Sequence, residues 1–199
     1  MFDIELYKDR LISDIGEKRY KHSLRVMECA ERLSEGKKVD KEKVKVAAFL
    51  HDCAKYNEER YMRELNIDHF DEIDPDLSKS VLHSFLGAEV AKKVYNVKDE
   101  EILKAIKYHT TGKENMNLLE KIVFIADAIE EKRSYPGVEE IRKKAFNDLD
   151  TGVLECLNHN IRYLLDIDAF IDPLTLKARN YMIKEKNGKA WNYFTDIRW

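Results

Sequence analysis

Apolar residues recur at intervals of three and four positions along almost the whole chain. This spacing gathers apolar side chains on one face of an α-helix. No stretch combines the alternation of a strand with a hairpin signal, so the pattern predicts an all-α protein. The predicted helices span residues 3–13, 18–35, 41–55, 58–65, 82–95, 99–110, 117–132, 138–165 and 173–186.

Polar residues mark the ends of several predicted helices. Asp40 and Asp99 each precede a helical stretch, where a carboxylate caps free backbone N–H groups. Asp172 followed by Pro173 supplies a cap and a residue favoured in the first turn. The sequence RSYPGV at 133–138 predicts a turn between two helices. Seven glycines and three prolines in 199 residues suit long helices with short connections.

The balance of charge narrows the classes of partner. The chain has 35 Lys and Arg against 38 Asp and Glu, a formal net charge of −3, which gives no overall attraction to nucleic acid or an anionic membrane. The longest apolar run, at 122–129, is too short to span a bilayer, and the first residues lack the features of a secretory signal. We therefore expect a cytoplasmic protein without a nucleic-acid or membrane partner.

Cysteines and charge-rich stretches are expected to be structural. Cys29, Cys53 and Cys156 form no CxxC pair, so they are expected to be reduced core residues. Stretches such as EEKR at 130–133 are most simply interpreted as solvated helix faces.

Four histidines interrupt the apolar faces of separate predicted helices. His22 and His83 each begin an apolar face, whereas His51 and His109 each end one. All four are therefore expected to point inward, where an unpaired polar group is costly to bury. His69 and His159 lie outside this pattern and are expected to be structural or surface residues.

Two aspartates accompany these histidines. Asp52 directly follows His51, and Asp127 lies within the apolar run IVFIADAI. A single inward histidine is more often a satisfied core residue than a ligand, and one arginine or a helix end would satisfy a single buried aspartate. Together, four inward histidines and two carboxylates supply the first shell of iron, manganese, cobalt or zinc, with positions left for water and a phosphate oxygen. The chain has no HExxH and no Glu-x-x-His, which excludes the usual zinc-protease helix and disfavours a ferritin-like bundle.

The order of these residues resembles a known signature. His22, then His51-Asp52, then Asp127 is similar to the H…HD…D pattern of the HD-domain metal-dependent phosphohydrolases. The stretches HSLRVMECAERL, AAFLHDCAK, LHSFLGAEVA, AIKYHTTG, FIADAIEEKRSYPGVEEIR and LTLKARN resemble the YqeK family of HD proteins, over roughly residues 18–182. Members of that family are described as symmetrical bis(5′-nucleosyl)-tetraphosphatases, which cut diadenosine tetraphosphate into two ADP using bound iron.

The resemblance implies roles for the polar cluster. His22, His51, Asp52 and Asp127 would bind the metal, as one or two ions, and His83 and His109 would contact the phosphates or complete a second metal position. Asp52 would also orient or deprotonate the attacking water, while His83 or His109 would protonate the leaving oxygen; the sequence leaves this choice open.

The resemblance also implies contacts to the substrate outside the cluster. Arg19, Lys55 and Arg133 would bind phosphates, and the segment from Ile171 to Thr175 would lie near the nucleotide. Many members are expected to have His-Pro in this segment, where this chain has Asp172-Pro173. Each cation has a second interpretation as a surface charge, and the helix dipole favours Arg133 at a helix end with or without a ligand.

The resemblance predicts a single HD-type helical domain over 1–199, with a metal core at about 18–132 and a helical extension at about 138–186. Within the long helix predicted there, Leu149, Val153, Leu157, Ile161 and Leu164 are expected in the core. The same core would also suit another nucleotide phosphatase or phosphodiesterase, or a non-catalytic metal or nucleotide sensor. The extension and the LTLKARN segment favour the tetraphosphatase. The oligomeric state stays open.

Overall fold

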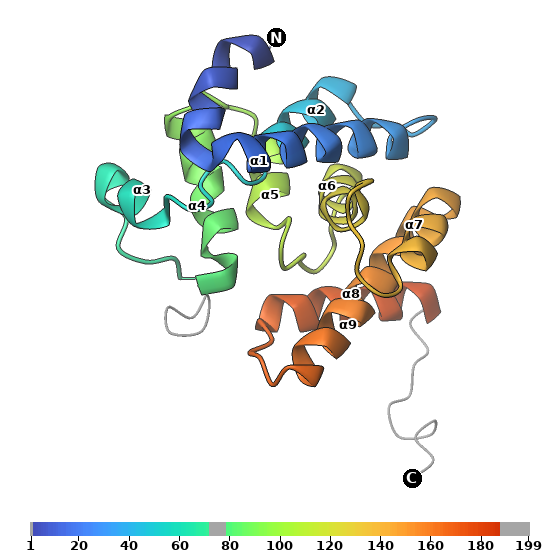
Figure 1. Cartoon of the computed structure of the whole chain (residues 1–199). Coiled ribbons are helices and arrows are strands. Elements are labelled where there is room, and N and C mark those ends of the chain that lie inside the picture. The colour runs from blue at the N-terminus through green and yellow to red at the C-terminus, as the bar shows by residue number, and fades with distance from the viewer. Residues whose placement is uncertain (1, 72–78, 188–199) are drawn as a thin grey trace.

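The computed structural model describes residues 2–71 and 79–187. These residues form helices and no strands, which confirms the predicted all-α fold (Figure 1). The helices are α1 (Ile4–Leu33), α2 (Lys41–Leu50), α3 (Glu58–Leu65), α4 (Lys79–Lys93), α5 (Glu100–Lys107), α6 (Leu118–Ile129), α7 (Val138–Asn147), α8 (Leu149–Asp166) and α9 (Pro173–Asn187). No helix in these two ranges is long and apolar enough to cross a membrane.

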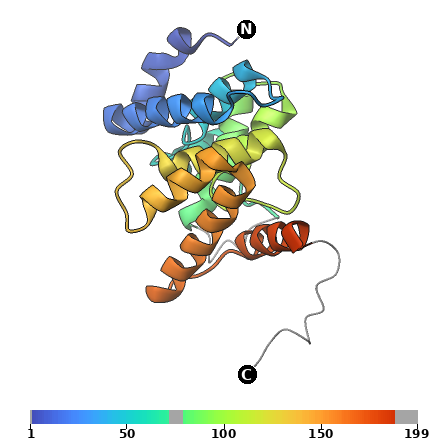
Figure 2. The ribbon, with the colours of Figure 1, turned by 90° about the vertical axis from the view of Figure 1, so that its right-hand side faces the viewer.

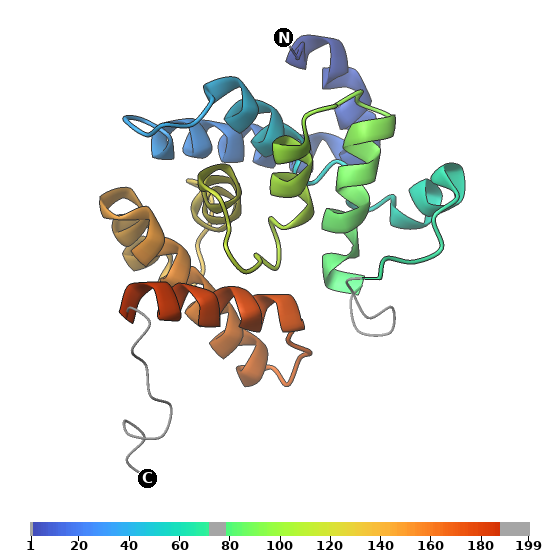
Figure 3. The ribbon, with the colours of Figure 1, turned by 180° about the vertical axis from the view of Figure 1, so that it is seen from behind.

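The central helices are α5 and α6, which pack against each other and against α2. The helix α1 packs on α2 and α6, while α8 packs on α6, α7 and α9. In Figures 1, 2 and 3, α1 lies above α6 and α9 lies below it. Phe49, Ile106 and Ile125 are fully or almost fully buried between these layers. The core therefore lies around α6, and segments distant in sequence meet there.

The first two predicted helices join into the single helix α1, which kinks at Gly16. Its backbone has φ 77° and ψ 157°, a region that glycine enters without steric cost. Just before the kink, the buried carboxylate of Asp14 accepts hydrogen bonds from the hydroxyls of Tyr61 and Tyr95, both at 2.6 Å. These contacts fix the first segment of α1 against α3 and the end of α4.

Two predicted helices end earlier than expected, each just before a site histidine. The helix predicted at 41–55 ends at Leu50, and the one predicted at 99–110 ends at Lys107. His51 and His109 therefore lie in turns. In both turns the ring Nδ1 lies 2.7 Å from the carbonyl oxygen three residues earlier. The imidazole therefore bonds to a carbonyl that would otherwise accept a backbone N–H of a continuing helix.

The prediction of one helix over 138–165 is wrong, because the chain breaks at Asp148. This residue is extended, with φ −148° and ψ 112°, and its side chain accepts the N–H of Thr151 at 2.7 Å as the cap of α8. The break lets α7 and α8 pack closely, with Gly152 against Ala145. Of the residues expected in the core, Leu149, Val153 and Leu157 are buried, whereas Ile161 and Leu164 are only partly buried.

Other local predictions are confirmed. Asp40 and Asp99 cap their helices, each accepting two backbone N–H groups. The carboxylate of Asp172 accepts the N–H of Leu174 at 2.8 Å at the start of α9. The three cysteines are buried and form no disulfide.

Candidate functional site

Four predicted ligands from three parts of the chain meet at one point. His22 comes from α1, His51 and Asp52 from the turn after α2, and Asp127 from α6. Nε2 of His22 lies 2.9 Å from an Asp127 oxygen, and Nε2 of His51 lies 3.3 Å from an Asp52 oxygen. The ligand atoms of His22, His51 and Asp127 all lie within 4.8 Å of one another, a spacing that fits a shared metal ion.

The hydrogen bonds of the two histidines leave their Nε2 atoms directed at this point. Nδ1 of His51 pairs with the carbonyl of Ala48, and Nδ1 of His22 lies 3.2 Å from Glu130 Oε1. The opposite atoms, Nε2 of His22 and of His51, and one oxygen of Asp52, are buried and lie close to one another's side chains or to Asp127, but none makes a hydrogen bond of suitable geometry. Because such orphaned atoms are costly, their convergence fits a bound cation.

Both carboxylates of the cluster carry a negative charge. Burial alone would raise the pKa of Asp52, but His51 and two further histidines outweigh it and hold the pKa well below its usual range. Burial is likewise outweighed at Asp127, where His22, His51 and Arg133 hold the pKa well below its usual range. The donor set is therefore two imidazoles and two ionised carboxylates, which suits a borderline divalent metal.

A second group of possible ligands shares His51 with the group formed by His22, His51 and Asp127. Ligand atoms of His51, Asp52 and His109 also lie within 4.8 Å of one another. Oδ1 of Asp52 lies 3.6 Å from Nε2 of His109 and 3.3 Å from Nε2 of His83. The hydroxyl of Thr110 lies 3.1 Å and 3.4 Å from the same two ring nitrogens. The carboxylate of Asp52 thus faces histidines of both groups.

His83 has a pKa well below the usual range of a histidine. Burial lowers its pKa to about 4, and the neighbouring His109 and Lys55 add to this effect. Nζ of Lys55 lies 3.4 Å from Nε2 of His83, close enough for a hydrogen bond. His83 is therefore an uncharged hydrogen-bonding group at neutral pH in this structure.

The three predicted phosphate partners all border the cluster. Arg19 Nη1 lies 2.9 Å from an Asp52 oxygen, and Lys55 Nζ lies 3.8 Å from the other. Arg133 donates from Nε to the backbone carbonyl of Asp127 at 2.8 Å and from Nη2 to its carboxylate. Each of the three cations therefore contacts a carboxylate of the cluster.

The sequence analysis missed Glu130, which was interpreted as part of a solvated stretch. Glu130 is in fact buried, with 2% of its surface exposed. Its carboxylate accepts from Arg25 Nε at 2.7 Å and from the backbone N–H of Lys132 at 2.7 Å, besides facing His22. Arg25 and His22 lie three residues apart and share one side of α1, but this spacing does not identify the carboxylate that both of them contact.

The predicted nucleotide segment borders a pocket of about 210 Å³ near the histidines. Thr175 and Asp172 line it, whereas Ile171 does not. The remaining wall includes Ser80, Val81, Thr110, Leu164 and Phe170. Through Thr110 the pocket reaches His83 and His109.

The two histidines outside the pattern stay away from this centre. The ring of His69 is largely exposed and lies 3.2 Å from a carboxylate oxygen of Asp71. His159 packs against the ring of Tyr135, with centroids 4.7 Å apart. Both agree with the structural or surface interpretation.

Comparison with known proteins identifies the family. The sequence model of the HD domain matches residues 19–132, which include all four residues of the H…HD…D order. This chain belongs to the HD domain family. A symmetrical bis(5′-nucleosyl)-tetraphosphatase from Halalkalibacterium halodurans is 38% identical to this HD protein over 173 residues, 86% of this chain and 92% of the relative. One of the same name from Staphylococcus aureus is 38% identical over 184 residues, 90% of this chain and 94% of the relative.

A solved structure supports the fold of this HD protein. The crystal structure of a "predicted HD superfamily hydrolase involved in NAD metabolism" from Clostridium acetobutylicum has a TM-score of 0.81 and 39% sequence identity. The likeness covers 93% of this chain and 99% of the other. Together with the curated relatives, it confirms the resemblance to the YqeK-type HD proteins.

Proposed function

We propose that this HD protein hydrolyses diadenosine tetraphosphate symmetrically into two ADP at a metal held by His22, His51, Asp52 and Asp127. The observation that carries the proposal is the convergence of these side chains, with orphaned buried atoms, from three separate segments. The names of relatives that match nearly the whole chain support the substrate and the symmetry of the cut.

The proposed metal is iron, as the resemblance to the family implies, and the donor set also suits manganese, cobalt or zinc. Imidazole with carboxylate and without thiolate is compatible with all four. The group formed by His51, Asp52 and His109 supports a second ion position beside the first. When bound, the metal would lower the pKa of a water and polarise a phosphoryl oxygen.

The side chains around the centre divide the remaining work. The ionised carboxylate of Asp52 orients the attacking water and accepts its proton. Arg19, Lys55 and Arg133 balance the negative charge that grows on the phosphate oxygens as the bond to the leaving ADP breaks. His83 and His109 lie on the phosphate side of the centre in this proposal, because their Nε2 atoms lie 3.3 Å and 3.6 Å from the same oxygen of Asp52, and either ring could protonate the leaving oxygen.

One nucleoside would occupy the pocket beside α8 and α9. Apolar side chains of Val81, Leu164 and Phe170 suit a base, and the hydroxyl of Thr175 suits a ribose. Thr110 joins this pocket to the histidines, so the attached phosphates would enter the centre directly.

The test is chromatographic analysis of the products that the iron-loaded protein forms from diadenosine tetraphosphate. We expect ADP as the sole product. AMP together with ATP would contradict the symmetrical cut. A mononucleotide or a cyclic nucleotide, hydrolysed faster than diadenosine tetraphosphate, would favour another HD-type activity. Bound metal without turnover of any of these would favour a sensor.

A further inference from the structure

A second pocket, of about 490 Å³, meets the candidate metal centre at a different residue. It reaches the centre at His22, and its wall combines α1, the turn after α2 and the turn after α6. It shares no lining residue with the pocket beside α8 and α9. The first pocket is lined by residues of α4, α8 and α9 and the second by residues of α1, and α1 and α9 lie on opposite sides of α6 in Figures 1 to 3.

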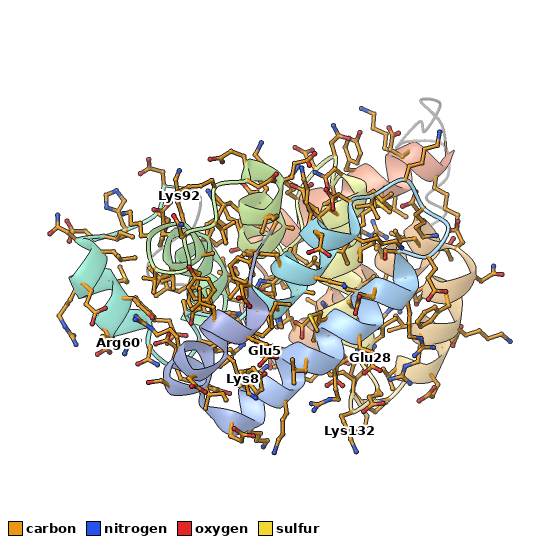
Figure 4. All side chains as sticks on the ribbon, turned by 90° about the horizontal axis from the view of Figure 1, so that it is seen from above. Glu5, Lys8, Glu28, Arg60, Lys92 and Lys132 are labelled. Atoms are coloured by element: carbon orange, nitrogen blue, oxygen red, sulfur yellow. The ribbon has the colours of Figure 1, made fainter. Side chains whose placement is uncertain are left out.

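The wall of this second pocket is strongly basic. Five of its lining residues are cations, namely Lys18, Arg19, Arg25, Lys132 and Arg133, against two carboxylates. Three of these cations already contact carboxylates, because Arg19 pairs with Asp52, Arg25 with Glu130 and Arg133 with Asp127. Lys18 and Lys132 form no ion pair with a carboxylate in the described part of the chain. Lys132 extends from the turn after α6 to the surface beside α1 (Figure 4). The positive charge of the two lysines, beside the paired arginines, suits a polyphosphate.

Tyr56 gives this basic wall an exposed aromatic ring. The residue is 65% exposed, yet its backbone has φ 71°, a left-handed conformation that a residue with a bulky side chain rarely adopts. The neighbouring Asn57 side chain donates to the backbone carbonyl of Asp14 and fixes the turn. Arg19 donates to the Tyr56 hydroxyl at 3.2 Å, and its Cζ lies 5.7 Å from the ring centroid. The contacts of Asn57 and Arg19 thus hold Tyr56 in a strained backbone conformation with most of its ring exposed to solvent. Burial of the ring does not explain why this conformation is kept.

A symmetrical cut adds a geometric requirement. The substrate has two identical nucleoside diphosphate halves joined at the bond that breaks, so each half must lead away from the centre in its own direction. The proposed function assigns one nucleoside to the pocket beside α8 and α9, which measures about 210 Å³, so the other half needs a place of its own.

We propose that the basic pocket binds the second nucleoside diphosphate half, with its base stacked on Tyr56 and its phosphates against Lys18, Arg19 and Lys132. This inference rests on the proposed function. Stacking on an aromatic ring is tolerant of base identity, because every base has a π-face. The pocket would therefore select for a second base of any kind over a bare polyphosphate end.

The test compares two ligands in one assay. Diadenosine tetraphosphate has two bases, whereas adenosine 5′-tetraphosphate has the same number of phosphates and one base. For diadenosine tetraphosphate the assay measures the KM for ADP formation. For adenosine 5′-tetraphosphate it measures the inhibition constant as a competitor, a constant that is defined whether or not this ligand is cleaved. We expect Tyr56→Ala to raise the ratio of KM to inhibition constant at least about fivefold, from the range for base stacking.

Two further variants make the result specific. Tyr56→Phe keeps the ring but removes the hydroxyl that Arg19 contacts, and it should keep the wild-type ratio. Phe146→Ala is the matched control, because Phe146 is 40% exposed, lies 4.9 Å from the guanidinium carbon of Arg32 and lines neither pocket. It should also keep the wild-type ratio.

The inference and the proposed function fail in different ways. A wild-type protein that forms no ADP from diadenosine tetraphosphate overturns the proposed function, and this inference with it. An active wild type whose ratio is unchanged in Tyr56→Ala overturns this inference alone. A ratio that rises equally in Tyr56→Phe also overturns it, because Tyr56 would then act through Arg19.

Discussion

Replacing Glu130 by Gln tests whether a buried carboxylate behind His22 supports the metal centre. Glu130 Oε1 lies 3.2 Å from Nδ1 of His22, on the side of the ring away from the cluster. A carboxylate there fixes the orientation of the imidazole and increases the basicity of Nε2. The substitution keeps an oxygen acceptor for the ring but removes the charge that Arg25 also contacts.

The expected magnitude follows from these contacts. Loss of a carboxylate behind a ligand histidine typically lowers metal affinity by about 10- to 100-fold. Because glutamine preserves one acceptor, we expect a loss of about tenfold, equivalent to about 1.4 kcal/mol of binding free energy.

Calorimetric titration of the metal-free protein with Mn²⁺ or Co²⁺ would measure this change. Glu131→Gln provides a matched control, because it removes the same charge from an exposed neighbour in the same turn. We expect its metal affinity to stay within about twofold of the wild type. Folded Glu130→Gln protein with wild-type metal affinity would refute the reasoning and leave Glu130 as a structural partner of Arg25.

Two further predictions concern the fold. Asp14→Asn should lower the free energy of unfolding at pH 7 by about 3 kcal/mol, because it leaves buried donors facing an amide. Burial would raise the pKa of Asp14, but hydrogen bonds from Tyr61, Tyr95 and Arg60 outweigh it and lower the pKa. The stabilisation is thus present above the unfolded-state pKa of about 4 and is lost as pH falls through the lower folded-state pKa. The difference in free energy of unfolding between wild type and variant, measured by urea denaturation, should therefore shrink upon acidification. A difference that stays constant with pH would contradict this prediction. Gly152→Ala would place a Cβ 2.4 Å to 2.7 Å from Ala145 atoms, and should reduce stability by about 2 kcal/mol in the same assay. An unchanged or raised midpoint would show that α7 and α8 separate without cost.

Helical periodicity was sufficient to predict the fold class and most helices, because the core is built from amphipathic helices around α6. It failed where a local hydrogen bond ended a helix. The carbonyls that pair with the rings of His51 and His109 end two helices early, and the cap at Asp148 divides a long one. Periodicity continues across such points and gives no sign of them.

The candidate site was likewise predictable from the sequence only in part. The inward histidines and Asp127 were visible because each interrupts an apolar face, and the structure brings them together. Glu130 was not visible, because it follows an apolar helix directly and begins a charge-rich stretch. Its burial depends on α1 crossing the end of α6, a tertiary contact that residue spacing does not encode.

The most direct test of the central claim measures bound iron and ADP formation together in His51→Ala and Asp127→Ala. His69→Ala is the control, because it removes an exposed histidine outside the centre. The account predicts that both ligand variants remain helical by circular dichroism, lose stoichiometric iron and lose ADP formation from diadenosine tetraphosphate, while the control keeps both. Full ADP formation by either ligand variant, or iron retained at the wild-type level in both, would contradict a metal centre at these residues.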